Sequence, residues 1–125
     1  MATAEAAISP EQLRDRTKAF ASRVIRLYVA LPAKPVAQVI GRQLLRAGTS
    51  VGANYRAACR GRSRPDFISK LGIVAEEADE TIYWLELLSD NDIVKPQRLS
   101  ELLKEAHELT AIFTAALDTS KAKGR

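Results

Sequence analysis

The chain of 125 residues has one cysteine and one histidine, Cys59 and His107, and only 6% of its residues are aromatic. A single cysteine cannot form a disulfide within the chain, and two such residues cannot supply the nucleophile, base and metal-ligand sets of most enzymes. No stretch approaches the roughly 18 consecutive apolar residues of a membrane span, and the first thirty residues carry no secretory or organellar targeting pattern. We therefore expect a bacterial, cytoplasmic protein that is not an enzyme and needs no cofactor or metal.

What the sequence does contain is typical of one globular domain, because 46% of the residues are hydrophobic, 27% are charged, and the length suits a single core. Proline and glycine divide the chain into four stretches of similar length, each with apolar residues at spacings of three and four. The pattern predicts an all-α fold with helices over about 10–31, 35–60, 64–89 and 96–118.

Two of the four helix starts carry recognisable caps. Ser9 and Gln12 flank Pro10 as in a capping box, and Ser63 precedes Pro65 in the same way. Because the helices have matched lengths and short connections, neighbours must run antiparallel, which predicts an up-down-up-down four-helix bundle over residues 9–118. Residues 1–8 are expected to be a disordered N-terminal tail, and residues 119–125 a polar C-terminal tail.

Each helix has one apolar stripe that should face the bundle core. The stripes consist of Leu13, Thr17, Phe20, Val24, Leu27 and Leu31; of Val36, Ile40, Leu44, Ala47, Val51, Tyr55 and Ala58; of Phe67, Leu71, Val74, Ala78, Ile82, Leu85 and Leu88; and of Leu99, Leu102, Ala106, Leu109, Phe113 and Ala116.

Charge is strongly segregated along the chain. Within the net charge of +4, residues 32–62 carry +6 and contain no acid, residues 63–90 carry −5, and the rest of the chain carries +3. Four arginines of the second helix fall within about 40° of one direction on the helical wheel and extend over about 27 Å. This arginine stripe consists of Arg42, Arg46, Arg56 and Arg60. Arginine's planar fork suits phosphate oxygens, so the stripe is a candidate nucleic-acid-binding site.

Acidic residues of the third helix are the competing partners of this stripe, among them Glu76, Glu77 and Glu80. Because the stripe lies opposite the apolar side of its own helix, we expect it not to reach the neighbouring helix of the same bundle. An intermolecular partner is therefore favoured, and it is either phosphate or the acidic face of another subunit.

The third helix has a second apolar edge, formed by Ile73 and Trp84 and flanked by Tyr83. Tyrosine and tryptophan are favoured at protein interfaces, so this edge is a candidate oligomer interface. The alternative, that these side chains only widen the core, is equally compatible with the sequence.

The sequence does not support three possible chemical sites: a di-metal site, a phosphate loop and a reactive cysteine. Glu76 and Glu80 suggest a di-metal bundle, but position 104, three residues before His107, is a lysine where such sites need a glutamate. The glycines of the segment Gly48–Gly52 are followed by no Lys-Ser/Thr pair, so this is not a phosphate loop, and two glycines one turn apart favour close helix packing. Cys59 has no histidine near it in sequence and is interpreted as a structural thiol.

Three segments resemble the four-helix-bundle family of 23S rRNA intervening sequence proteins. They are IGRQLLRAGTSVGANYRAACR at 40–60, FISKLGI at 67–73 and ETIYWLELL at 80–88. The resemblance extends from the first helix to the fourth. The arginine stripe matches the family's basic helix, and Tyr83-Trp84 matches its signature in the third helix.

The resemblance implies an antiparallel bundle that assembles into a closed homo-oligomeric ring, commonly a pentamer. It also implies kinship with accessory proteins of diversity-generating retroelements, which bind nucleic acid and a reverse transcriptase through a basic surface. The leading hypothesis is thus a non-enzymatic, ring-forming bundle that binds RNA or DNA. The alternative is a protein-interaction scaffold whose arginine stripe pairs with a neighbouring subunit or with a partner such as a reverse transcriptase.

Overall fold

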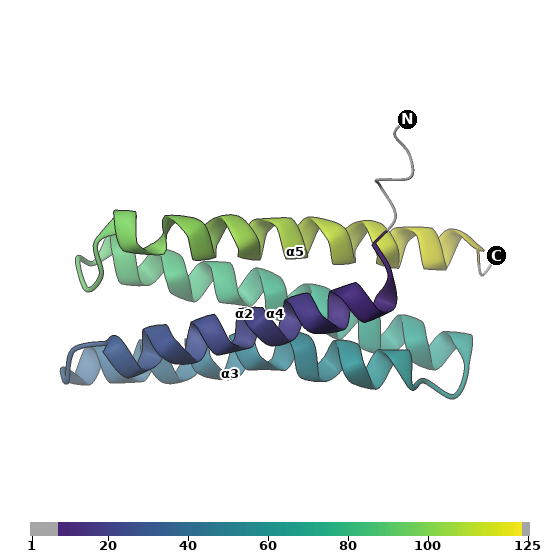
Figure 1. The fold of residues 1–125 in the computed structure, drawn as a ribbon, viewed down its shortest axis with the longest axis horizontal. Coiled ribbons are helices and arrows are strands. Elements are labelled where there is room, and N and C mark those ends of the chain that lie inside the picture. The colour runs from purple at the N-terminus through teal and green to yellow at the C-terminus, as the bar shows by residue number, and fades with distance from the viewer. Residues whose placement is uncertain (1–7, 124–125) are drawn as a thin grey trace.

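The computed structural model describes residues 8–123, which form four helices joined by short connections. The helices are α2 (Pro10–Ala30), α3 (Pro35–Cys59), α4 (Arg64–Asp90) and α5 (Pro96–Lys123). Figure 1 shows that successive helices run in opposite directions, so that α2 begins and α5 ends at the end of the bundle that holds the α3–α4 connection. The expected four-helix bundle is confirmed, and the described residues contain no strand.

Local capping sets the helix starts as the sequence predicts. The Ser9 hydroxyl accepts a hydrogen bond from the Gln12 backbone N–H at 3.0 Å, and the Gln12 side chain accepts one from the Ser9 N–H at 2.9 Å. At the start of α4 the Ser63 hydroxyl accepts a hydrogen bond from the Asp66 N–H at 3.2 Å. These caps satisfy N–H groups that have no partner within the helix.

The C-terminal end of the bundle differs from the prediction. The last helix was expected to stop at 118, but α5 continues to Lys123. No glycine or proline interrupts residues 119–123. Lys121 and Lys123 lie in the last turn, where cations interact favourably with the helix dipole. Of the expected disordered tail over 1–8, only Ile8 lies within the described residues, and it precedes α2.

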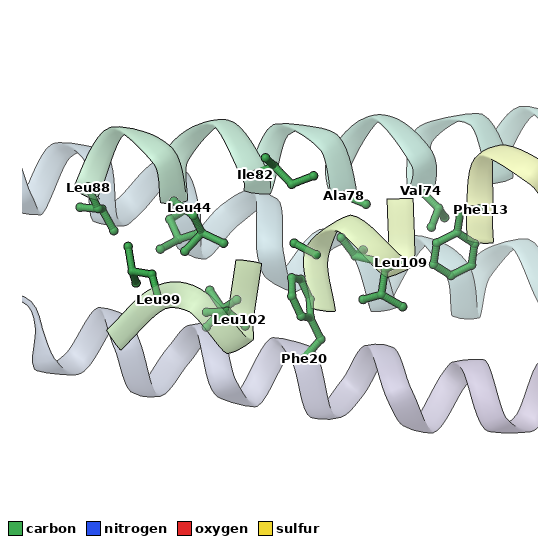
Figure 2. Close-up of a cluster of buried hydrophobic side chains, with 14 of the residues drawn as sticks. Phe20, Leu44, Val74, Ala78, Ile82, Leu88, Leu99, Leu102, Leu109 and Phe113 are labelled. Carbon is green, nitrogen blue, oxygen red and sulfur yellow. The ribbon is translucent and has the colours of Figure 1, made fainter. Parts of the chain in front are cut away.

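The core is built from the four predicted stripes (Figure 2). Val36 is the clear exception, because its side chain is 53% exposed whereas Ala37 is fully buried. At this end of the bundle Gly41 of α3 faces the end of α2, and a Cβ on Gly41 would lie only 2.6 Å from the Leu31 side chain and 3.0 Å from the Tyr28 ring. The largest side chains with less than 2% exposure include Phe20, Leu44, Leu71, Leu85, Leu88, Leu99, Leu109 and Phe113.

Two further glycines hold α2 and α3 close together. A Cβ on Gly48 would lie 2.8 Å from a Val24 methyl group, and one on Gly52 would lie 3.2 Å from the Thr17 hydroxyl. The expectation that these glycines permit close helix approach is therefore confirmed. Thr17 remains satisfied although buried, because its hydroxyl donates to the Leu13 carbonyl at 2.8 Å.

The seam between α2 and α5 is the least packed of the four. Arg16 crosses it, donating two hydrogen bonds of 2.7 Å to Glu105 and one of 2.7 Å to Glu108. This hydrogen bonding holds the pKa of the Glu105 carboxyl below its usual range. Ion pairs thus link α2 to α5 where the two helices pack only lightly against each other.

Candidate nucleic-acid interface

The arginine stripe does not stay intact in the folded chain. Arg46 donates to both carboxylate oxygens of Glu77, at 3.1 and 3.2 Å, and also bonds Glu80, and both acids belong to α4 of the same chain. The expectation that the stripe cannot reach the neighbouring helix of its own bundle is therefore wrong for Arg46. The other three arginines form no ion pair within residues 8–123.

The position of Arg46 on the stripe, together with the length of its side chain, explains the difference. Arg46 lies on the α4 side of the stripe, and its long flexible stem carries the guanidinium around the edge of the α3–α4 contact. Glu80 is held in place from the other side, because the Trp84 indole N–H donates to it at 2.9 Å. The bonds from Trp84 and Arg46 lower the pKa of Glu80, so the carboxylate stays charged opposite the arginine.

Arg56 of α3 and Arg60, which caps the C-terminus of α3, border a groove against α2. This α2/α3 groove has a volume of about 600 Å³. It is lined by Arg14, Asp15, Lys18, Ala21, Thr49, Gly52, Ala53, Arg56, Cys59 and Arg60. The uncharged residues that line the groove have small side chains, so space remains between the two helices.

The electrostatics of the α2/α3 groove are dominated by four cations, two from each side. Arg14 and Lys18 come from α2, while Arg56 and Arg60 come from the end of α3, and Asp15 is the one acid among the lining residues. Across residues 8–123 none of the four cations has a side-chain ion-pair partner. Uncompensated cations that converge on a concave surface raise the local potential and attract anions.

Sequence reasoning missed Arg14 and Lys18 as site residues. They are four positions apart on α2, so they share a helix face, and Ala21 follows three positions later on the same side. That signal was available in the sequence. It is a weak signal because the helix containing them also carries acids and has a smaller net charge than α3.

The residues of the predicted oligomer interface have different environments. Ile73 and Tyr83 are 40% and 53% exposed, whereas Trp84 is partly buried and packs against the core. The two rings of Tyr83 and Trp84 meet edge to face with centroids 5.0 Å apart. Trp84 therefore contributes to packing within the bundle, while Ile73 and Tyr83 expose apolar surface to solvent.

No metal-binding site accompanies the groove in the part of the chain that the structure describes. Three His, Cys, Asp or Glu side chains do not come together there in a metal-binding arrangement. Cys59 is exposed at the groove wall, and burial raises the pKa of the adjacent Tyr55, which stays protonated. None of the four described helices has a stretch apolar and long enough to cross a membrane.

The fold and this surface define a single-domain helical bundle with a cationic groove on one side. The family model described as "23S rRNA-intervening sequence protein" matches residues 12–115. The chain belongs to this family. A crystal structure of a protein of unknown function from the S23 ribosomal protein family of Bacteroides thetaiotaomicron is similar, with 34% identity and a TM-score of 0.82. The match covers 89% of this chain and 99% of that one. No curated protein matches the chain.

Proposed function

We propose that the protein is a non-enzymatic, cytoplasmic, ring-forming bundle that binds the backbone of RNA or DNA through its basic surface. The observation that carries this proposal is the group of four cations without ion-pair partners in residues 8–123 that line the α2/α3 groove: Arg14, Lys18, Arg56 and Arg60. Arg42 extends the same face along α3, whereas Arg46 contributes less because Glu77 and Glu80 neutralise it.

Phosphate contacts would dominate such binding, since the groove offers guanidinium and ammonium donors and no aromatic side chain for bases to stack on. Little sequence preference is therefore expected. Assembly into a homo-oligomer, as a pentameric ring, would repeat the basic surface and raise the avidity for a long polyanion. The exposed side chains of Ile73 and Tyr83 support an assembly interface on α4.

The protein should bind a fluorescein-labelled oligonucleotide of about 20 nucleotides, with an affinity that falls about 20-fold or more between about 50 and about 200 mM KCl. Arg56→Glu should weaken binding about tenfold beyond the effect of the matched reversal Arg98→Glu on α5. Fluorescence anisotropy measures both effects. Absence of binding to RNA and DNA at the lower salt would refute the proposal.

The second candidate is a protein-interaction scaffold, in which the basic surface pairs with a neighbouring subunit or with an acidic partner such as a reverse transcriptase. It is favoured by the exposed acids Glu76 and Glu86, which Arg46 leaves unpaired. Multi-angle light scattering separates the two candidates. If the scaffold is correct, Arg56→Glu should lower the mass of the assembly, whereas for a nucleic-acid-binding ring only a variant of the apolar edge, such as Tyr83→Glu, should do so.

A further inference from the structure

We infer that the α2/α3 groove receives one single strand of nucleic acid, whose phosphates lie between the two walls of cations. This inference rests on the proposed function and adds to it the form of the nucleic acid and the place where it binds. It is supported by the shape of the groove, the arrangement of the charges and the size of the residues between them.

The four cations face one concavity from opposite sides. Arg14 and Lys18 lie on α2, and Arg56 and Arg60 lie on the last turn and at the C-cap of α3, so a backbone between them meets positive charge on both sides. A duplex presents two backbones on a wide convex surface, whereas the space of about 600 Å³ between two neighbouring helices suits one backbone. Here the protein surface is concave and the charge lies on its walls, as in grooves that track a single backbone, but phosphate contacts would replace base stacking because no aromatic side chain lines the groove.

The small side chains between the walls give the strand its space. Ala21, Gly52 and Ala53 line the groove, and about 600 Å³ is open between the helices. Gly52 also packs against Thr17, so the same small residue that brings the helices together leaves the surface above it low. The lining that runs from Thr49 to Arg60 extends about 16 Å along α3, which is enough for several successive phosphates.

The single cysteine of the chain provides a direct test in the wild-type protein. Cys59 is exposed and lies at the groove wall. An oligothymidylate of about 20 nucleotides should slow its alkylation by N-ethylmaleimide at least about fivefold at low salt, and KCl should restore the rate. A duplex of the same length should protect Cys59 much less. Intact-mass spectrometry follows the reaction.

A matched pair of variants tests the groove without changing charge. Ala53→Leu fills the space between the walls and should weaken binding of the oligothymidylate at least about fivefold. Ala111→Leu makes the same change at an exposed position of α5 and should have no effect on this binding. If Ala53→Leu proves unfolded by circular dichroism, Ala21→Leu fills the groove from the α2 wall in its place.

The outcomes separate this inference from the proposed function. If oligonucleotides bind in a manner that Arg56→Glu weakens, but Cys59 is not protected and the leucine variants bind normally, the groove is not the site and only this inference fails. Equal affinity for duplex and single strand, with equal protection of Cys59, also overturns it. If no nucleic acid binds at low salt, both fail together.

Discussion

Replacing Gly48 by leucine is expected to lower the free energy of unfolding by about 3 kcal/mol, because the new side chain must enter the close α2–α3 contact. Even a Cβ at this position would lie 2.8 and 2.9 Å from the two methyl groups of Val24, which is itself completely buried. Gly48→Ala should therefore also destabilise, by about 1 kcal/mol, although alanine is the better helix former. Urea denaturation followed by circular dichroism at one protein concentration measures these changes.

Gly72 on α4 provides the control for Gly48. Apart from the adjoining backbone of α4 and its two chain neighbours, no atom lies within 4 Å of a Cβ built on Gly72, so Gly72→Ala should stabilise the protein by about 0.5–1 kcal/mol through helix propensity alone. A second control is Val24→Ala combined with Gly48→Ala, since removing the valine methyls relieves the clash and should give a favourable coupling of about 1 kcal/mol. Equal stabilisation by Gly48→Ala and Gly72→Ala would show that the helices do not meet there.

Most of the bundle could be predicted because its determinants are local. Ser9 and Gln12 encode a cap within four residues, and apolar spacing of three and four identifies the buried side of each helix without knowledge of its neighbours. Val36 was placed wrongly because the first turn of α3 lies at the end of the bundle, where the buried side turns toward Ala37 and Gly41. A helical wheel holds no information on where the partner helix ends.

The candidate site was harder to predict because its parts come from two helices. The wheel places Arg46 and Arg56 on one stripe, yet the first reaches acids on α4 and the second lines a groove with cations of α2. Which of two flanking helices an edge residue meets depends on the packing of the bundle. Arg14 and Lys18 gain their significance only from that packing, since on α2 alone they are ordinary exposed cations.

The structure changes the position of the candidate interface but not its chemistry. Basic residues still define the candidate interface, but its centre moves from the outer surface of α3 to the concavity between α3 and α2. Charge reversal at Arg46 now has a structural cost, because a glutamate there would face Glu77 and Glu80. Tests of binding should therefore use Arg56, whose side chain has no partner to lose among the described residues.

Phe113→Ala is expected to be the most damaging single truncation, lowering the free energy of unfolding by about 3–5 kcal/mol. Phe113 is fully buried, and its ring centroid lies 5.1 Å from that of Tyr55 on α3. The helix α5 packs mainly against α4 and only lightly against α2. The contact between Phe113 and Tyr55 adds a direct link from α5 to α3 across the core. The conservative variant Phe113→Leu keeps most of the volume and should cost less than about 1.5 kcal/mol.

The same substitution links the core to the candidate site. Tyr55 precedes Arg56 and lies one turn before Cys59, so the cavity left by Phe113→Ala lies beneath the α3 wall of the α2/α3 groove. Loss of that support should raise the rate at which Cys59 is alkylated in the absence of nucleic acid, whereas Phe113→Leu should leave the rate near that of the wild type. Equal unfolding energies for the alanine and leucine variants would contradict the close packing of Phe113. An unchanged alkylation rate would show that the groove wall holds its shape without this contact.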